Sequence, residues 1–317
     1  MIPRALLVLV AFAWWLVPGT ASAAPSCAAT TVSALSFGSP SLLSGAAVDT
    51  TATLSISCSA VASGTFTYCH DLNAGSGGTS GTNRVMTKSG GATLVYNFYQ
   101  DAARTIPWGS RTNSSLGTVP AVTITGGSAP TGTRTIYGRI IASQQGVAPG
   151  AYSSTFSGAQ VQFYRLASGQ SNCATGTVDS NVAVTSPGFT VSASPIADCT
   201  ISVGSLNFGT QGSLSALVDA SSTMSASCTG STPYTIGLGN GANSSNPAAR
   251  KMVSGANSIT YSLYLDAART TVWSTATTAS GTGTGSSINH IVYGRVPAQT
   301  TPQPGTYGDS VVATLTY

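Results

Sequence analysis

The residues that could carry acid–base or nucleophilic chemistry are few in this chain. All eight acidic residues are Asp, and the two histidines are His70 and His290. Neither histidine stands beside a nucleophile motif, because no Gly-x-Ser-x-Gly and no Ser-x-x-Lys pattern occurs. The chain also lacks a phosphate loop and a Gly-x-Gly-x-x-Gly turn. We therefore expect no enzymatic activity and no cofactor.

Several charged and aromatic residues occur twice, at matching places in the two halves of the chain. A residue shared by two copies with different roles is more often structural than functional. The tryptophans that could stack on a sugar, Trp108 and Trp273, are such a pair, which favours core packing over carbohydrate binding. The matched charged residues are Asp49 and Asp219, Asp101 and Asp266, Arg104 and Arg269, and Arg139 and Arg295.

The six cysteines divide into four in the first half of the chain and two in the second. Two pairs stand at matching places, 31 residues apart in the first half and 29 in the second, and we predict that both are disulfides. The two remaining cysteines form the natural third pair. Metal binding is the alternative, but the chain has no Cys-x-x-Cys motif and few histidines. The predicted bonds are Cys27–Cys58, Cys199–Cys228 and Cys69–Cys173.

The composition indicates a folded, exported chain with weak charge. Charged residues make up 6% and hydrophobic residues 42%, so the chain can build a core under a surface of neutral polar groups. A net charge of +4 without a basic run gives no reason to expect a nucleic acid partner. Arg4, the apolar run 5–17 and Ala21-Ser22-Ala23 predict a signal peptide over residues 1–23. Export implies an oxidising compartment, where disulfides persist.

A duplication covers the rest of the chain. Segments 96–108 and 261–273 share the motif Tyr-x-x-Tyr-x-Asp-Ala-Ala-Arg-Thr. The copies also share Leu-x-Phe-Gly after the first cysteine, a Tyr-Gly-Arg triplet and a Pro-Gly-x-Tyr segment. A period of this length duplicates a whole domain, unlike the short repeats of a solenoid. We predict an N-terminal domain over 24–194 and a C-terminal domain over 195–317, joined near 185–197.

Each copy has the pattern of antiparallel β-structure. Residues 52–58 and 311–317 alternate between apolar and polar side chains, which is typical of half-buried strands. About seven strands in about 120 residues predict an all-β fold of two tandem immunoglobulin-like β-sandwich domains. The first copy continues well beyond its last shared strand, whereas the second ends inside a strand. We therefore expect the second domain to lack its final strand.

These motifs resemble the spore coat U family, the secreted subunits of archaic chaperone–usher pili. The resemblance spans nearly all of the mature chain, twice, and rests on the paired cysteines and the shared motifs. Subunits of that family are immunoglobulin-like sandwiches without a last strand. A periplasmic chaperone lends a strand, which the next subunit's N-terminal extension then replaces. The resemblance implies a periplasmic pilus chaperone, an outer-membrane usher and a strand-donating subunit as partners.

The resemblance also implies which subunit this is. Cleavage after Ala23 would leave only Ala24, Pro25 and Ser26 before Cys27, too few residues for a donor segment. A chain that accepts a strand but donates none fits the free end of a fibre, and two-domain members of the family resemble tip adhesins. We therefore expect a pilus tip adhesin, exported through the periplasm to the cell surface as part of a fimbrium, that supports surface attachment and biofilm formation.

The pattern of strand completion in the family implies where a donor strand would bind. In the second domain it would lie between the first and the last strand. The first domain should complete itself with an alternating segment between Val178 and Val191. The predicted acceptor residues are Ile201, Val203, Leu206, Phe208, Val311, Ala313, Leu315 and Tyr317.

A candidate adhesive surface lies in the first copy. Tip adhesins of the family have apolar loop tips, and this copy carries nine extra residues between Trp108 and the Tyr-Gly-Arg triplet. We interpret them as an added hairpin with exposed apolar residues; alternatively, Val122 and Ile124 face the core of an extra strand. Segment 147–149 is a second candidate loop. The adhesive candidates are Val119, Pro120, Val122, Ile124, Val147 and Pro149.

Two other functions stay open at the level of sequence. A structural pilin or adaptor inside the fibre would need a donor segment, which the sequence does not show. A secreted glycan-binding β-sandwich protein would need converging polar groups, and a shallow sugar site could lie among the Asn and Thr residues. No motif indicates which surface or ligand is bound.

Overall fold

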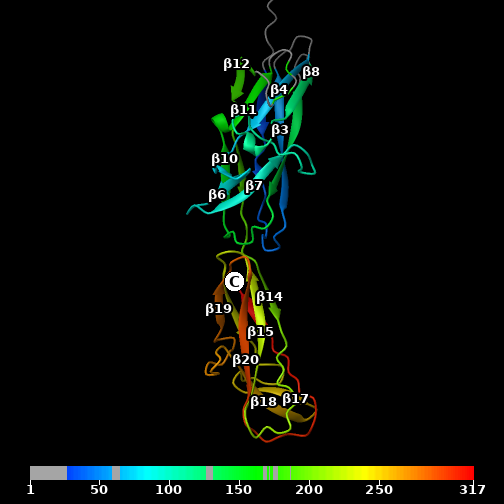
Figure 1. Cartoon of the computed structure of the whole chain (residues 1–317), viewed down its shortest axis with the longest axis vertical. Helices are drawn as coiled ribbons and strands as arrows, with labels where there is room; N and C mark the ends of the chain where they lie inside the picture. Colours follow the sequence, from blue (N-terminus) through cyan, green and yellow to red (C-terminus); the bar gives the residue numbers. More distant parts are fainter. Residues whose placement is uncertain are drawn as a thin grey trace, which may run out of the picture.

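The structure is a computed structural model that describes residues 27–58, 65–125, 131–166, 170, 172–173, 178–185 and 187–317. The predicted signal peptide lies outside the described residues. Figure 1 shows an elongated molecule in which two β-sandwiches stand end to end, with the first domain above the second. The predicted all-β fold with two tandem sandwiches is confirmed. No helix in the described part of the chain is long and apolar enough to cross a membrane.

The first domain forms two sheets. The larger has the order β1-β3-β9-β7-β6-β10-β13-β2, with β5 paired to β6, and the smaller has the order β12-β11-β4-β8. Its strands are β1 (Cys27–Val32), β2 (Leu35–Ser36), β3 (Val48–Cys58), β4 (Thr65–Leu72), β5 (Thr79–Ser80), β6 (Asn83–Thr87), β7 (Thr93–Tyr99), β8 (Ala121–Thr125), β9 (Thr131–Ile140), β10 (Tyr152–Phe156), β11 (Val161–Leu166), β12 (Val178–Thr185) and β13 (Phe189–Ala193), with short 3-10 helices η1 (Ser114–Leu116) and η2 (Gly158–Gln160).

The second domain repeats most of this arrangement in shorter form. One sheet has the order β14-β15-β20-β18-β17, and the other has the order β19-β16-β21. Its strands are β14 (Cys199–Val203), β15 (Val218–Cys228), β16 (Pro233–Leu238), β17 (Arg250–Ser254), β18 (Asn257–Tyr264), β19 (Ala279–Thr282), β20 (Ser287–Val296) and β21 (Ala313–Thr316).

Alternation along the strands builds the core of each sandwich. In β3, Ala52, Leu54 and Ile56 are buried while the residues between them face outward. The two equivalent tryptophans lie at the centres of the cores: Trp108 is fully buried and Trp273 is 1% exposed. Each indole nitrogen donates a 2.8 Å hydrogen bond to a backbone carbonyl of the facing sheet. Both tryptophans are therefore core residues and are not available to stack on a sugar.

Disulfides cross-link both domains. Cys199 bonds Cys228 and joins β14 to β15, and Cys69 bonds Cys173, as expected from the sequence. Cys58 is disulfide-bonded and lies opposite Cys27 in the β1–β3 register, although the side chain of Cys27 lies outside the described residues. A cross-link that closes a loop of about 30 residues stabilises a domain by about 3–4 kcal/mol in the chain-entropy model.

The two domains meet through a short segment that is bonded to the first domain. The amide of Ile196 donates to the carbonyl of Pro40, and Ser41 donates from its hydroxyl to the carboxylate of Asp198. On the other side, Gly230 donates from its amide to the carbonyl of Gln145 at 2.9 Å. A Cβ atom on Gly230 would lie 1.9 Å from the neighbouring carbonyl oxygen of the first domain, so this close approach requires glycine.

Candidate functional site: an open strand position in the second domain

Strand β13 completes the large sheet of the first domain. It lies between β10, with which it pairs antiparallel over five residues, and β2, with which it pairs parallel. Its residues Phe189, Val191 and Ala193 are buried. The ring of Phe189 stacks on that of Phe156, with 4.7 Å between the ring centroids. The first domain therefore fills its own last strand position, as expected from its longer sequence.

The corresponding position of the second domain contains no strand. The shared Leu-x-Phe-Gly motif makes 206–207 the counterpart of β2, and the shared Pro-Gly-x-Tyr motif makes 307–311 the counterpart of β10. Residues 199–317 are all described, and none of their strands lies between these two segments. The second domain therefore lacks a counterpart of β13, and β21, the counterpart of β11, likewise has no strand beside it in the place of β12.

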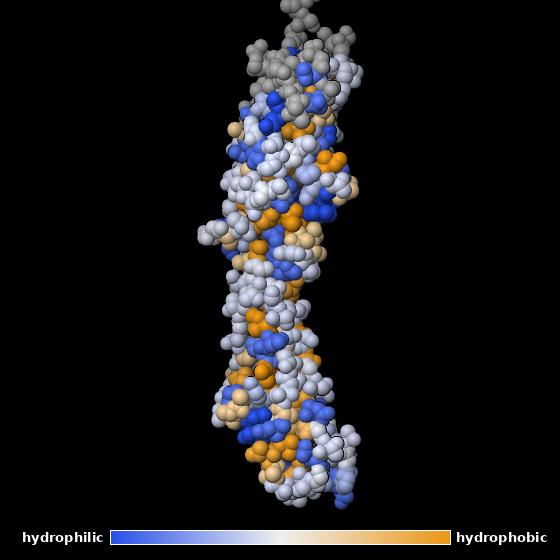
Figure 2. All heavy atoms as spheres, in the orientation of Figure 1, coloured by the Kyte–Doolittle hydropathy of each residue, from blue (hydrophilic) through white to orange (hydrophobic). Residues whose placement is uncertain are grey.

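A groove occupies the open position. Two adjoining cavities of about 280 and 620 Å³ lie between the segments 203–214 and 301–313. Figure 2 shows apolar side chains gathered in this part of the second domain, at its end far from the first domain. The apolar residues that line the groove include Leu206, Phe208, Met224, Leu238, Met252, Tyr261, Leu263, Val292 and Val311.

The eight acceptor residues expected from the sequence divide into two groups. Five of them line the groove: Val203, Leu206, Phe208, Val311 and Ala313. Ile201 and Leu315 instead pack against the core cluster of the second domain. Tyr317 follows the far end of β21, where it is 57% exposed and lines a separate hollow beside β16 and β19. Tyr317 therefore does not line the groove, although Ala313 of β21 does.

Sequence reasoning missed the groove residues contributed by other strands. Met252 comes from β17, and Tyr261 and Leu263 come from β18. The repeat could have indicated them, because their counterparts in the first copy, Met86, Tyr96 and Phe98, are fully buried core residues. A core position in the complete copy is a groove position in the incomplete one.

One acidic residue, Asp309, also lines the groove. The hydroxyl of Tyr261 donates to its Oδ2 at 2.7 Å, and the amide of Ala242 and the Nδ2 of Asn243 donate to its Oδ1 at 2.9 and 3.0 Å. Burial, together with this hydrogen bond and the carboxylate charge, raises the pKa of Tyr261. Behind the tyrosine, Arg250 is fully buried and donates to the carbonyl oxygens of Gly239, Pro247 and Trp273.

Comparison with known families agrees with the duplication. The model of the Spore Coat Protein U domain matches residues 14–158 and again residues 166–314. The chain belongs to the Spore Coat Protein U domain family. No curated protein matches the chain in a sequence search.

Solved structures with a similar fold are pilus subunits. The CsuC–CsuE chaperone–tip adhesion subunit pre-assembly complex from the archaic chaperone-usher Csu pili of Acinetobacter baumannii is 20% identical, with 92% of this chain and 100% of that chain covered and a TM-score of 0.53. The CupB6 tip adhesin of Pseudomonas aeruginosa is 11% identical, with 92% of each chain covered and a TM-score of 0.37. The likeness to the Csu complex shows the fold; the second match is too distant to carry an argument.

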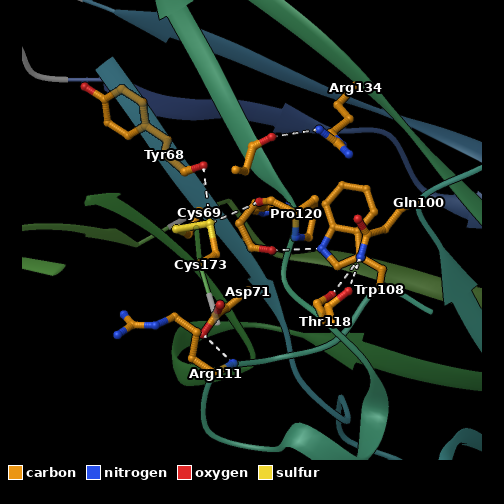
Figure 3. Close-up of a disulfide and its surroundings, with 12 residues drawn as sticks. Tyr68, Cys69, Asp71, Gln100, Trp108, Arg111, Thr118, Pro120, Arg134 and Cys173 are labelled. Carbon is orange, nitrogen blue, oxygen red and sulfur yellow. Dashed lines mark hydrogen bonds between the residues drawn. A yellow bond between two sulfur atoms is a disulfide. The ribbon is translucent and has the colours of Figure 1, made fainter. Parts of the chain in front are cut away.

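The adhesive candidates of the first spore coat U domain do not form an exposed patch. Val119 and Ile124 are 8% and 6% exposed, and Pro120 is buried. Figure 3 shows the reason: the Cys69–Cys173 disulfide lies against this segment, and the sulfur of Cys173 is 3.5 Å from the carbonyl oxygen of Pro120. Val122 is half-buried and packs against the core, as does the buried Ile124, so both residues face the core, although their strand is not an extra one.

The second candidate loop lies at the end of the first domain that meets the second domain. Val147 and Pro149 are half-buried, and the adjacent Gly146 contacts the second domain at Gly230 and Gly285. The loop therefore belongs to the junction between the domains. Sequence position could not reveal this, because successive loops of a sandwich lie at opposite ends.

The added hairpin was also a wrong interpretation. Strand β8 is the counterpart of β19, and each pairs with the equivalent strand of its own domain, β4 or β16. Most of the extra residues precede β8: twelve residues separate Trp108 from β8, but only five separate Trp273 from β19. They form the loop that contains η1 and covers the outer face of β4.

Two buried ionisable groups lie beneath and beside this loop. His70 is fully buried, burial lowers its pKa to about 3, and neither ring nitrogen has a hydrogen-bond partner among the described residues. Asp71 is 2% exposed, burial raises its pKa to about 6, and its Oδ2 accepts from the amide of Arg111 (Figure 3). The second domain has Ile236 and Gly237 at these positions, so the pair is special to the first domain.

Proposed function

We propose that this chain is the tip adhesin subunit of an archaic chaperone–usher pilus and that a β-strand from another protein completes its second domain. One contrast carries the proposal: the first domain fills its last strand position with β13, and the second leaves the same position open. An added strand would pair with the main chain along one or both edges and place alternate side chains in the groove. Family membership and the fold of the Csu complex support this reading.

The open groove also supports the need for a chaperone. An exposed apolar groove beside unpaired strand edges is an aggregation hazard in any secreted protein. A periplasmic chaperone that occupies the groove removes this hazard until an outer-membrane usher brings the next subunit, which donates its strand. The solved Csu structure is described as a complex of a chaperone with a tip adhesion subunit before assembly.

The arrangement of the two domains favours a place at the fibre tip. Because the strand position of the first domain is filled from within, a fibre can connect through the groove of the second domain and leave the first domain free. In this arrangement the first domain meets the surface, and the chain supports attachment and biofilm formation from a fimbrium outside the cell.

Strand acceptance is tested by giving the full mature chain its own second copy of β13. Residues 187–196 are appended after Tyr317 through a flexible linker of about 12 residues, long enough to span the domain. We expect the unfolding temperature of the second domain to rise, as measured by differential scanning calorimetry. The matched control carries Asp in place of the appended counterparts of Phe189 and Val191, which removes the inward side chains. No rise with the apolar strand, or an equal rise with the control, rejects the proposal.

The place in the fibre is tested separately. Pili from cells that produce the chain with an epitope tag are labelled with gold and viewed by electron microscopy. We expect a single label at the free end of each fibre, and loss of attachment when the chain is deleted. Labels along the shaft would assign the chain to the interior of the fibre, and normal attachment after deletion would reject the adhesive role.

A further inference from the structure

The edge of the groove is weakly paired on both sides. This groove edge, residues 307–312, has one bridge to β17, in which Gly308 and Val253 exchange backbone hydrogen bonds of 2.9 and 3.2 Å. A further bond joins the amide of Gly239 to the carbonyl of Val312. In the first domain the counterpart strand β10 likewise touches β6 at one residue, but five residue pairs with β13 hold its other side. The second domain must hold the groove edge by other means while the groove is empty.

We propose that Asp309 positions the groove edge for strand acceptance. Its carboxylate joins the groove edge to β18 through Tyr261 and to the loop 240–243 through Ala242 and Asn243. Hydrogen bonds to a charged acceptor are about twice as strong as neutral ones. The loop comes close enough because Gly241 has a φ of 84°, and a Cβ there would lie 2.1 Å from the Oδ2 of Asp309.

The complete domain has no carboxylate at the corresponding place. The counterpart of Asp309 is Ser154, a neutral and fully buried residue whose Oγ accepts from the amide of Gly77 at 3.2 Å. The counterpart of Tyr261 is Tyr96, whose hydroxyl lies toward Ser154 but forms no hydrogen bond of ordinary geometry with a described residue. The charged link therefore occurs in the domain whose own strand is missing.

The buried arginine beneath the groove gives the carboxylate a second role. The negative charge of Asp309 acts on Arg250 and partly offsets the effect of burial, which lowers the pKa of this guanidinium. In the first domain no carboxylate acts on Arg84 in this way, and Asn97 accepts a hydrogen bond from it instead. Asp309 thus links the groove edge to the charge of the core as well as to two neighbouring segments.

This inference rests on the proposed function, and its test separates the two. Backbone hydrogen exchange of residues 307–312 is measured in the full mature chain, with disulfides formed, for the wild type, Asp309→Ser and Tyr261→Phe. We expect exchange of the groove edge to become at least about tenfold faster in Asp309→Ser, because three hydrogen bonds lose their charged acceptor. Tyr261→Phe should give a smaller increase. The matched control, Tyr96→Phe, should leave the corresponding residues 152–157 unchanged.

Binding of a synthetic peptide of residues 187–196 gives the second readout. We expect its affinity for Asp309→Ser to fall about tenfold while Tyr96→Phe binds like the wild type. Unchanged exchange of 307–312 in Asp309→Ser overturns the inference, even if the wild type binds the peptide and the proposed function stands. A wild type that binds no peptide, with faster exchange in the variant, supports the positioning role and counts against strand acceptance. If Asp309→Ser does not fold, Tyr261→Phe decides in the same way.

Discussion

The two domains contain nearly the same core residues, yet only one of them closes its core. Leu35 and Phe37 are 0% and 7% exposed in the first domain, whereas their counterparts Leu206 and Phe208 are only half-buried. Nothing in these side chains differs. The difference comes from β13, which lies after the last shared strand. The comparison shows that completeness in this fold depends on a segment added to the duplicated unit and not on a change within it.

Charged clusters at matching positions are the same in both copies. Asp49 receives Arg104 at 3.1 Å and Arg139 at 2.7 Å, and Asp219 receives its two arginines at 3.2 and 2.7 Å. The loop that carries one arginine of each cluster is held by an aspartate of its own. Asp101 accepts from the amide of Ile106 in the first copy, and Asp266 accepts from the amide of Thr271 in the second. The structural role expected for the matched charges therefore agrees with their geometry. Function is better sought where the copies differ.

The largest effect should come from breaking β13 itself. Phe189→Asp combined with Val191→Asp places two charges in the core, and we expect the first domain to lose at least about 5 kcal/mol of stability. Urea unfolding followed by hydrogen exchange of each domain measures the loss. Peptide 187–196 added in trans should restore part of it, because the variant has become an acceptor. An unchanged first domain would show that β13 does not complete the sandwich.

A smaller loss should follow from a charge at Val119. Because Val119 lies beside the Cys69–Cys173 disulfide, Val119→Asp should destabilise the first domain by about 3 kcal/mol. The control, Thr123→Asp on the exposed face of β8, should change stability by less than about 0.5 kcal/mol. Surface attachment should fall in Val119→Asp only together with stability. Lost attachment in a fully stable variant would restore Val119 as a contact residue.

Acid should affect the two domains differently through His70. Its pKa is about 3 in the folded state and about 6.5 in the unfolded chain, so the unfolded state binds more protons and stability falls as the pH drops below 6.5. The variant His70→Ile carries the residue of the second domain at this position. Its free energy of unfolding should rise relative to that of the wild type by about 1.4 kcal/mol for each unit that the pH falls in this range. Urea unfolding of both proteins from pH 7 to pH 4 measures this difference.

Asp71 changes the pH dependence of the free energy of unfolding in the wild type and in His70→Ile alike, so it leaves the difference between them unchanged. Its folded pKa of about 6 lies above the unfolded value of about 3.9, so protonation stabilises the fold as the pH falls from 6 to 4. The free energy of unfolding of the wild type should therefore change little between pH 6 and pH 4 and fall below pH 4. A gap between the wild type and His70→Ile that does not depend on pH would show that His70 is not kept neutral.

The smallest expected effect tests whether the matched ion clusters contribute equally to the stability of the two domains. Asp49→Asn and Asp219→Asn each weaken an exposed ion cluster, and each should cost its domain about 0.5–1 kcal/mol. High salt should reduce both losses. The measurement is urea unfolding of each variant, and the informative result is equality: a clearly larger loss in one domain would mean that its cluster has a further role.

Much of the fold followed from the sequence because the duplication provides its own internal control. The period-two pattern of residues 52–58, the matched cysteines and the unequal lengths of the two copies each predicted what the structure contains. The errors arose where a prediction required knowledge of which residues meet across sheets. Alternation makes Val119 apolar whether it faces solvent or a disulfide, and only the covering loop decides. The role of Asp309 could likewise not be predicted from the sequence, because its partners Tyr261 and Ala242 lie far from it along the chain.

The junction between the domains has a mechanical consequence. The connecting segment is bonded to the first domain at Ile196 and Asp198, and Gly230 holds the other side against the Gln145 carbonyl. These bonds connect the two domains directly, so tension on the first domain passes to the second through them. In the proposed fibre, this tension would then pass along the second domain to the strand donated into its groove.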